Sequence, residues 1–162
     1  MLALEGCRTT SQEAHAEGRR LLRRMYELHS GKPMPAISVD SRGKPHFVGG
    51  DLYFSITHTR GHVFCALSDK PIGIDAEELD RNINLNLASK ILSPGEMAQY
   101  LAAEDRRLAL LTFWVLKEAH VKCLGTGLTG YPNNTDFSLE DSRVFQRDGC
   151  ILAVIEENEN AF

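Results

Sequence analysis

Three features common in other protein classes are missing from this sequence of 162 residues. The cysteines Cys7, Cys65, Cys123 and Cys150 lie far apart and form no C-x-x-C pair, which indicates neither a zinc site nor a dense disulfide framework. No apolar run approaches the roughly 18 residues of a membrane span, and no basic segment precedes an apolar one at the N-terminus, as in a signal peptide. We therefore expect a soluble cytoplasmic protein with reduced thiols and no membrane association.

An excess of basic residues is also missing. The formal net charge is -4 and the isoelectric point is near 5.9, whereas proteins that bind nucleic acid broadly are basic, so we expect no nucleic-acid partner. The composition that is present, 43% hydrophobic and 25% charged residues, is typical of globular proteins. The length suits one compact unit or two small halves packed together, but not two independent domains.

A helix is predicted over residues 14–28. Thr10 followed by Glu13 has the form of a capping box, and apolar residues recur at helical spacing as far as Leu28, before Gly31 ends the pattern. The opposite face carries Arg19, Arg20, Arg23 and Arg24. These arginines form either a solvated face or a contact surface for phosphate or an acidic partner.

Short extended segments are predicted at 37–39 and 46–48, within a stretch rich in proline and glycine. Residues 52–57 alternate as a strand, and the chain turns at 59–61 and returns over 62–67. We expect the strand around 72–77 to follow as the third strand of an antiparallel meander.

The rest of the chain favours helices and a final hairpin. A short helix is expected around 87–92, and Ser93 followed by Pro94 and Glu96 marks the start of a second one, which runs to about residue 101. A longer helix is predicted from 105 to 124, ended by glycines. Residues 143–147 and 150–155 form a β-hairpin, with a type I′ turn at 148–149.

Two acids interrupt the apolar strand at 72–77. Because side chains alternate on a strand, Ile72, Ile74 and Ala76 point to one face, whereas Asp75 and Glu77 point to the other. The Cα atoms of the two acids lie about 6.6 Å apart, close enough for their carboxylates to share one hard cation. The alternative is a strand end with two solvated acids.

The helix at 105–124 carries a second pair of charges. Its apolar stripe, set by Leu111 and Val115, continues at steps of three and four to Glu118 and Lys122. Either the two form an exposed i, i+4 ion pair, or they face inward, where charges need a partner. Combined with the acids at 75 and 77, an inward Glu118 would complete a magnesium site that faces phosphates.

Together these stretches resemble the 4′-phosphopantetheinyl transferase superfamily, in particular the type that activates surfactin synthetase and similar megasynthases. The matching motifs are G-K-P at 43–45, F-S-I-T-H-T at 54–59, I-G-I-D-A-E at 72–77, W-V-L-K-E-A at 114–119 with Lys122, and G-T-G-L at 125–128. The resemblance implies an α+β fold, in which two halves related by a pseudo-twofold axis enclose the site. The unit would span 1–162, with halves of about 1–70 and 71–162, and would act as a monomer.

The activity implied by the resemblance is transfer of the 4′-phosphopantetheine arm from coenzyme A to a serine of an apo acyl or peptidyl carrier protein. The other product is 3′,5′-adenosine bisphosphate. By the same resemblance, Mg²⁺ is held by Asp75, Glu77 and Glu118. Glu118 would also act as the base for the serine, directly or through a water.

The resemblance assigns phosphate contacts to four further residues. Lys122 would steady the leaving bisphosphate, and Lys44 and His58, with Thr57 beside them, would contact coenzyme A. Trp114 is expected to pack in the core rather than take part in the chemistry. The chain begins closer to the first helix than is usual in this type, and the basic residues that precede that helix in the family have no clear match.

Two other functions remain open from the sequence. A metal-dependent phosphodiesterase or nuclease also uses acids and a lysine, but usually with the last acid and the lysine on a strand, one residue apart. A coenzyme A binding protein without transferase activity would have no use for charges in an inward stripe. A trimeric relative with sites between subunits is disfavoured, because Lys44 and His58 lie in the same chain as the acids.

Overall fold

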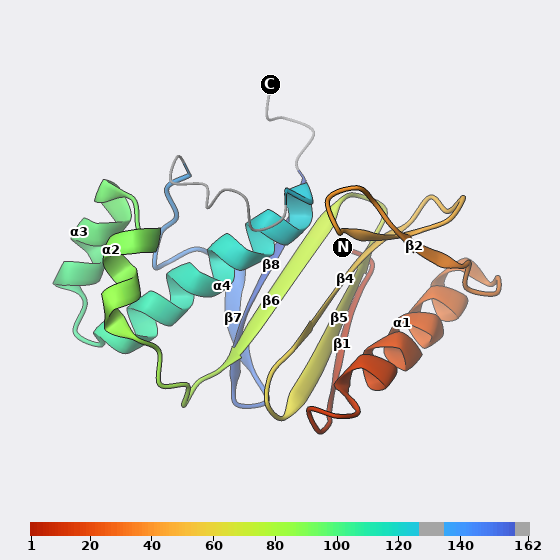
Figure 1. Ribbon diagram of the computed structural model, residues 1–162, viewed down its shortest axis with the longest axis horizontal. Helices are drawn as coiled ribbons and strands as arrows, with labels where there is room; N and C mark the ends of the chain where they lie inside the picture. Colours follow the sequence, from red (N-terminus) through yellow and green to blue (C-terminus); the bar gives the residue numbers. More distant parts are fainter. Residues whose placement is uncertain (127–134, 158–162) are drawn as a thin grey trace.

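The computed structural model describes residues 1–126 and 135–157 and has a mixed α and β architecture (Figure 1). Its elements in chain order are β1 Ala3–Arg8, α1 Ala14–Ser30, β2 Ile37–Val39, β3 Pro45–Phe47, β4 Tyr53–His58, β5 His62–Ser68, β6 Ile72–Glu78, the 3₁₀ turn η1 Leu85–Leu87, α2 Ala88–Ile91, α3 Pro94–Ala102, α4 Arg106–Leu124, β7 Val144–Arg147 and β8 Cys150–Glu156. None of the helices in these ranges has the length and apolar character needed to cross a membrane.

Two antiparallel sheets of three strands form the centre of the molecule. The first sheet has the order β1-β5-β4 and the second has the order β6-β8-β7, while β2 and β3 pair separately. Helix α1 packs on the first sheet and α4 on the second (Figure 1). Strands β4 and β6 lie side by side where the two sheets meet, and the Ser55 hydroxyl accepts a hydrogen bond from the Ile74 backbone N–H (3.1 Å).

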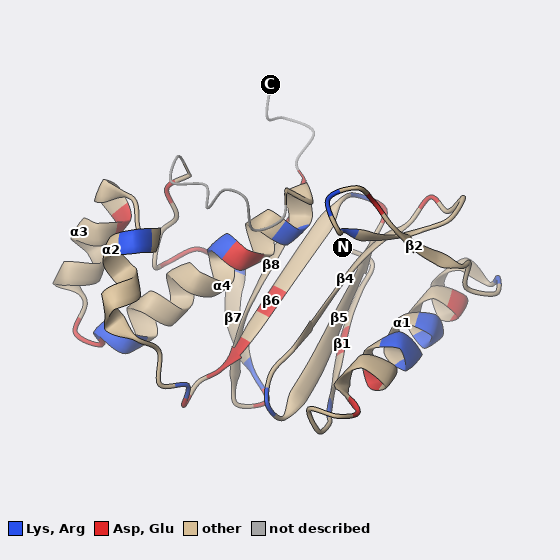
Figure 2. Cartoon of the chain, viewed as in Figure 1, with Lys and Arg blue, Asp and Glu red and all other residues tan. Residues whose placement is uncertain are grey.

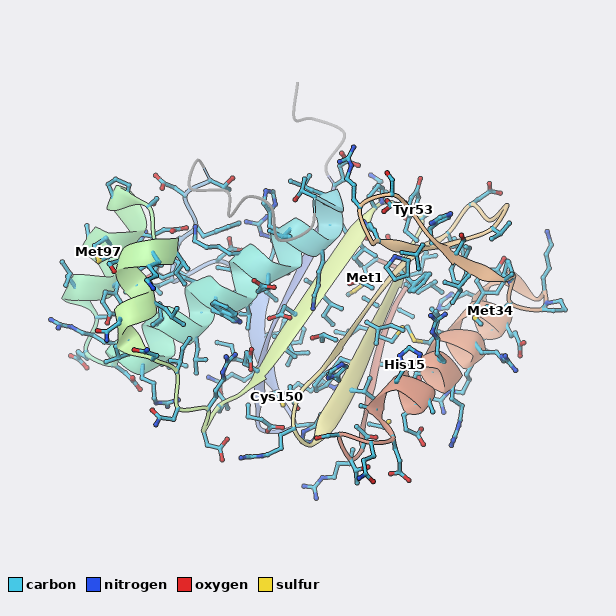
Figure 3. All side chains as sticks on the ribbon, in the orientation of Figure 1. Met1, His15, Met34, Tyr53, Met97 and Cys150 are labelled. Atoms are coloured by element: carbon cyan, nitrogen blue, oxygen red, sulfur yellow. The ribbon has the colours of Figure 1, made fainter. Side chains whose placement is uncertain are left out.

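Alternating side chains of the sheets supply three hydrophobic clusters. On β5, Val63 and Cys65 pack under α1, whereas Phe64 and Ala66 face the second sheet. Strand β8 behaves in the same way, since its Ile151 belongs to the cluster beneath α4. Side chains fill the space between each helix and its sheet (Figure 3). Burial of apolar area on both faces of the central strands therefore fixes the register of each sheet.

The predicted meander is wrong in its third strand. Strand β5 is central in its sheet and pairs with β4 on one side and β1 on the other, with Ala3 opposite Leu67. Because both of its edges are occupied, β6 pairs instead with β8, with Ile72 opposite Glu156. The sequence prediction missed β1, whose segment contains Glu5 and Gly6 and alternates poorly. Gly6 is needed there because a Cβ would overlap the Phe64 ring.

Helix α4 begins and ends at its capping residues, whereas α1 ends at its predicted glycine but begins three residues later than a capping box at Thr10 requires. Thr10 Oγ1 accepts from the Glu13 N–H (3.3 Å) and bonds the Glu13 carboxylate (3.0 Å), although α1 itself begins at Ala14. Gly31 ends α1 in the left-handed region at φ 66°, a conformation that costs glycine little. The stripe was extended too far at Leu28, which is 75% exposed because the helix has passed the edge of the sheet by then.

The remaining sequence predictions for local structure are confirmed. Ser93 and Glu96 form a capping box at the start of α3, and Asp105 Oδ1 accepts from the Leu108 N–H (2.9 Å) at the start of α4. Gly125 closes α4 with φ 65°. Asp148 and Gly149 have φ values of 52° and 75°, as the two central positions of a type I′ turn require. Gly127 and Leu128, from the last motif, lie outside the described residues.

Candidate active site

Asp75 is held where β6, β4 and α4 meet. Its Oδ1 accepts hydrogen bonds from the Lys122 ammonium (2.7 Å) and the Thr57 hydroxyl (3.2 Å), and Lys122 also donates to the Ile74 carbonyl (3.1 Å). The residue is only 7% exposed, which excludes the alternative of a solvated acid at this position. Its second oxygen, Oδ2, is buried and has no hydrogen-bond partner among the described residues.

Glu77 lies farther along the same face of β6. It accepts a hydrogen bond from the Trp114 indole N–H (3.1 Å) and forms an ion pair with Arg81. The Arg81 guanidinium in turn lies over the Trp114 ring, 5.5 Å from its centroid. Trp114 is therefore more than packing, because it orients an acid of the candidate site. Arg81 was not predicted from the sequence as a residue of the site.

Burial makes the carboxylates of Asp75 and Glu77 hard to ionise. Burial raises the pKa of Asp75 even though Lys122 and Thr57 act in the opposite direction. Burial also raises the pKa of Glu77, against the lowering effect of Arg81, and the nearby charge of Asp75 raises it further. Buried Asp75, whose Oδ2 has no partner among the described residues, and half-buried Glu77 on the same strand face suit a hard cation that would hold both in the ionised form.

A pocket of about 420 Å³ opens beside this pair of acids. Four of the predicted site residues line it: Lys44, His58, Glu118 and Lys122. Thr57, Asp75 and Glu77 are not part of its lining, and Asp75 is connected to it through Lys122. The structure therefore brings the predicted residues into one region, but in two layers: an open pocket and a buried acid pair behind it.

The pocket wall is basic on the side formed by the N-terminal part of the chain. His15 and Arg19 of α1, and Arg42 and Lys44 of the loop before β3, line it, whereas Glu118 is the acid in the lining. Such a wall suits an anionic ligand. The sequence analysis noted Arg19 but could not assign it, and it missed His15 and Arg42, which come together only through the fold.

Lys44 ties the loop before β3 to the end of α4. Its ammonium donates to the carbonyl of Cys123 (2.5 Å), one of the last carbonyls of the helix, which lack a partner within the helix. The side chain is half-buried, and burial lowers the pKa of its ammonium. Lys44 thus lies at the junction between the two parts of the chain, beside the pocket.

The three predicted magnesium ligands do not converge on one point in this structure. Within the ranges 1–126 and 135–157, the trio of side chains whose ligand atoms all lie within 4.8 Å of one another is His62, Glu78 and Cys150. Asp75, Glu77 and Glu118 are not such a trio. The donor chemistry still fits a magnesium ion, because all three are carboxylates and the unpaired Asp75 oxygen offers a ligand.

Lys117 has a structural place outside the site. It points away from the Glu118 stripe, as the helix geometry predicts, and is fully buried against Glu96 of α3, 2.8 Å from its carboxylate. The other contacts of Glu96 are with the backbone N–H groups of Ser93 (2.9 Å) and Phe137 (3.0 Å). This buried pair fixes α3 on α4 and leaves Glu118 and Lys122 for the pocket side.

Three of the four arginines on the arginine face of α1, Arg20, Arg23 and Arg24, are exposed, and Figure 2 shows basic and acidic residues along the helix. Arg20 and Arg24, the two arginines with the clearest partners, form ion pairs with Glu17 and Glu5, and their side chains remain 74% and 67% exposed. Exposed pairs of this kind add little stability. This face is therefore available to a partner.

Comparison with known proteins relates the chain to one family. The model of the 4′-phosphopantetheinyl transferase superfamily matches residues 71–154, more than half of the chain. The 4′-phosphopantetheinyl transferase gsp of Aneurinibacillus migulanus is 33% identical over 88 residues, covering 53% of this chain and 36% of the relative. The 4′-phosphopantetheinyl transferase Sfp of Bacillus subtilis (strain 168) is 32% identical over 114 residues, covering 68% and 50%.

A third relative extends the similarity beyond the bacilli. The 4′-phosphopantetheinyl transferase HetI of a Nostoc species is 31% identical over 121 residues, covering 68% of this chain and 51% of the relative. The chain thus spans about half, or less, of the length of these relatives. The matched segment includes β6 with its two acids, and α4 with Glu118 and Lys122. The resemblance suggested by the sequence motifs is confirmed, and the chain belongs to the 4′-phosphopantetheinyl transferase superfamily.

Proposed function

We propose that this protein transfers the 4′-phosphopantetheine arm of coenzyme A to a serine hydroxyl of an apo carrier protein, with Mg²⁺ as cofactor. The observation that carries the proposal is the buried Asp75, with one oxygen bonded to Lys122 and the other unpartnered among the described residues. It lies behind a pocket with a basic wall, within the segment that matches the family.

The reaction forms one phosphorus–oxygen bond and breaks another. The serine oxygen attacks the phosphorus that carries the pantetheine arm, and the bond from this phosphorus to the bridging oxygen of the pyrophosphate breaks. The bridging oxygen leaves with 3′,5′-adenosine bisphosphate, and the serine proton passes to a base. Because charge builds up on the phosphate oxygens, cations positioned around them lower the barrier.

Asp75, Glu77 and Glu118 would hold Mg²⁺, which would neutralise charge on the pyrophosphate. Glu118 lines the pocket and is the proposed base, directly or through a water. Asp75 needs the Lys122 ammonium at 2.7 Å to remain ionised in a buried position, so the lysine both holds this acid and offers its positive charge to the leaving group.

The other contacts to coenzyme A come from the N-terminal part of the chain. Lys44 and His58 line the pocket and are the proposed partners of the phosphates, together with Arg19 and Arg42. Thr57 was expected beside them, but its hydroxyl bonds Asp75 at 3.2 Å. We therefore give Thr57 a positioning role through that acid.

The organisation of the molecule is part of the same proposal. Residues 1–70 and 71–162 form two halves of one unit, related by a pseudo-twofold axis. Supporting this, each half contributes one sheet of three antiparallel strands and one long helix. A monomer is supported because residues of both halves line one pocket within a single chain. The protein acts in the cytoplasm, on acyl or peptidyl carrier proteins.

The test is the intact mass of an apo carrier protein after incubation with coenzyme A, Mg²⁺ and the full chain. We expect the mass of one phosphopantetheine arm to be added, and we expect Asp75→Asn and Glu118→Gln to lower the rate at least about 100-fold. Asp80→Asn is the matched control, because Asp80 is an exposed acid whose partner is the exposed Arg60. It should keep the wild-type rate.

Three results would contradict the proposal. Mg²⁺-dependent transfer by Asp75→Asn near the wild-type rate would remove the metal site from β6. Binding of coenzyme A by the wild-type chain without modification of any carrier would favour the non-catalytic alternative. Hydrolysis of coenzyme A without carrier modification would favour the phosphodiesterase. Circular dichroism of each variant shows whether a lost activity reflects lost folding.

A further inference from the structure

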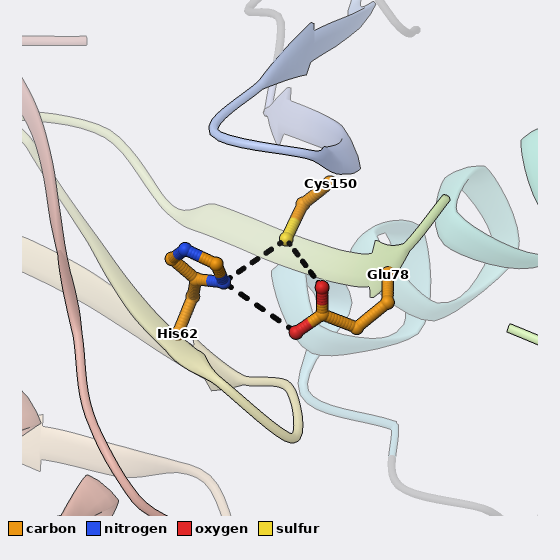
Figure 4. Close-up of side chains that lie close together, drawn as sticks. All are labelled: His62, Glu78 and Cys150. Carbon is orange, nitrogen blue, oxygen red and sulfur yellow. Dashed lines mark hydrogen bonds and ion pairs between the residues drawn. The ribbon is translucent and has the colours of Figure 1, made fainter. Parts of the chain in front are cut away.

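Three side chains that the proposed reaction does not use meet at the C-terminal end of β6. His62 opens β5, Glu78 closes β6 and Cys150 opens β8 (Figure 4). The His62 Nδ1 lies 3.4 Å from Glu78 Oε1 and 3.6 Å from the Cys150 sulfur. The sulfur lies 3.7 Å from Glu78 Oε2. Glu78 is about 10 Å along the strand from Asp75 and on its opposite face, so this cluster is separate from the candidate active site.

The nitrogen–oxygen spacing is long for a hydrogen bond. An N–H···O bond is usually about 2.7–3.2 Å long, and the Nδ1–Oε1 distance is 3.4 Å. One ligand atom from each of the three residues lies within 4.8 Å of the other two, and the Nδ1–sulfur distance of 3.6 Å matches two neighbouring ligands around a tetrahedral zinc ion. With usual bond lengths of about 2.3 Å to sulfur and about 2.1 Å to nitrogen and oxygen, neighbouring ligand atoms lie about 3.4 Å apart for nitrogen and oxygen and about 3.6 Å apart where sulfur is one of the pair.

The ligand set also favours zinc over a harder ion. Imidazole and thiolate bind zinc readily, whereas magnesium and calcium prefer oxygen ligands alone. The carboxylate of Glu78 is fixed by other groups: its Oε1 accepts from the Thr59 hydroxyl (2.6 Å) and from the Gly61 N–H (3.1 Å). Such outer contacts orient the ligands of metal sites. They leave the Oε2 oxygen directed at the sulfur.

A cysteine, a histidine and a glutamate could instead form a nucleophilic triad. In such a triad the histidine contacts the nucleophile through one ring nitrogen and the acid through the other. Here both Cys150 and Glu78 approach Nδ1, and Nε2 is buried with no hydrogen-bond partner in the described part of the chain. Burial, assisted by the charge of Glu78, raises the pKa of the Cys150 thiol to about 11, so the thiol is not activated for attack.

We propose that His62, Glu78 and Cys150 bind a zinc ion that links the two sheets of the molecule. Strand β5 belongs to the first sheet, and β6 and β8 belong to the second, so the ion would cross-link them at one end. A water would complete the four ligands. Such a site could not be predicted from the sequence, because its ligands lie singly on three strands and not in a spaced motif.

The test uses the full chain after removal of metals with a chelator. Zn²⁺ is titrated against a chromophoric chelator in buffer with excess Mg²⁺, which occupies the oxygen site of the proposed function. We expect one equivalent to bind. We expect Co²⁺ in its place to give the charge-transfer absorption of a cobalt–thiolate bond. Cys150→Ala should abolish that absorption and weaken Zn²⁺ binding at least about 100-fold, since changes outside the ligands alone cost 10–100-fold.

Cys7→Ala is the matched control, because Cys7 is a half-buried thiol on β1 that packs with Val63 under α1, on the opposite face of the first sheet from His62. It should keep both the affinity and the absorption. Glu78→Gln provides a second variant if Cys150→Ala does not fold, and it should weaken binding at least about 10-fold. Zinc should raise the melting midpoint of wild-type protein and Cys7→Ala by several degrees, and that of the two cluster variants by much less.

The proposal is overturned if wild-type protein binds no Zn²⁺ under these conditions. It is also overturned if Cys150→Ala and Glu78→Gln, shown to be folded, bind Zn²⁺ as tightly as wild type, because the ion then lies elsewhere. Carrier modification is a separate readout. If a variant loses zinc binding but still transfers the arm, the proposed function stands. If the chain binds zinc but transfers no arm, the zinc site stands and the proposed function does not.

Discussion

The two halves of the molecule differ in how the long helix meets its sheet. In the C-terminal half, α4 lies so close to β6 that a Cβ on Gly73 would overlap the carbonyl oxygen of Ala119. In the N-terminal half, a Cβ on Gly18 of α1 would meet side-chain carbons, Ile56 Cγ2 at 3.0 Å and Val63 Cγ2 at 3.2 Å. Side chains can shift by a few tenths of an ångström, whereas a packed backbone cannot. Helix α4 is therefore fixed more rigidly to its sheet.

The two helices also differ in how far their charged side chains are buried. Arg20 and Arg24 on α1 are exposed and form ion pairs with the half-buried acids Glu17 and Glu5. Helix α4 encloses Lys117 completely, with Glu96, and presents Lys122 to the buried Asp75. The comparison teaches that the acids and their lysine lie on the rigid half, while the exposed helix offers cations that can adjust to a ligand or partner.

The largest effect is expected at the glycine contact of the rigid half. Gly73→Ala places a methyl group against the backbone of α4, so the helix must move away from β6 or the fold is lost. We expect the free energy of unfolding to fall by about 5 kcal/mol or more, as much as the total stability of some small domains. Urea unfolding followed by circular dichroism measures this loss.

Gly18→Ala is the matched substitution in the other half. Alanine gains about 1 kcal/mol over glycine within a helix, and this gain offsets the cost of pressing on Ile56 and Val63. We expect the stability to change by no more than about 1 kcal/mol. Equal losses for the two variants would contradict the difference in rigidity between the two helices.

The next largest loss of stability is expected when the buried ion pair of Lys117 and Glu96 is broken. Lys117→Met removes the partner of Glu96 and leaves a buried carboxylate without its cation, which should cost about 3 kcal/mol. Adding Glu96→Gln to this variant should restore part of the loss, because the pair is then replaced by neutral side chains. The measurement is the thermal midpoint and urea stability of the single and double variants.

The matched variant for Lys117→Met is the replacement of an exposed cation on α1. Arg23→Met on α1 replaces a cation that faces solvent, and it should change the stability by less than about 0.5 kcal/mol. A loss at Arg23 as large as that at Lys117 would mean that the arginine face is packed against something and is not free for a partner.

Local signals in the sequence are sufficient to place most of the helices and the final hairpin. The caps at Ser93 and Asp105, and the closing glycines at 31 and 125, act within a few residues of chain, so they can be identified without knowing the fold. The acids of β6 were found for a similar reason, because strand alternation alone puts Asp75 and Glu77 on one face.

What could not be predicted depends on segments far apart in the chain. Strand β5 pairs with β1, and not with β6, on the edge that β4 leaves open. Neither the sequence of β1 nor that of β6 predicts which of them pairs there. Trp114 donates a hydrogen bond to Glu77 because α4 packs on β6 next to that acid. Lys117 is buried because α3 places Glu96 against it. A charged residue within a helix pattern indicates that a partner is needed, but not which residue supplies it.

The smallest loss of stability is expected at two acids that accept hydrogen bonds within turns, Asp141 in the C-terminal half and Asp40 in the N-terminal half. Asp141 accepts from the Arg143 guanidinium at 2.9 and 2.6 Å and from its backbone N–H at 3.0 Å. The hydrogen bonds from the Arg143 side chain, helped by the one from its backbone N–H, hold the pKa of Asp141 below its usual value. A carboxylate with a depressed pKa in the folded state stabilises the protein above the unfolded pKa of about 4, and this contribution is lost as the pH falls through the folded value.

Asp141→Asn should therefore lower the free energy of unfolding by about 1 kcal/mol at pH 7, and by less near pH 3, which lies below the unfolded pKa of about 4, because part of the wild-type contribution is lost there. Asp40 in the N-terminal half accepts only backbone N–H groups, from Arg42 (2.8 Å) and Lys44 (2.9 Å). Because an asparagine oxygen can accept the same bonds, Asp40→Asn should cost less than Asp141→Asn at pH 7. Urea unfolding of both variants at the two pH values tests the pair, and a penalty at Asp141 that persists undiminished in acid would show that packing, and not its charge, holds this turn.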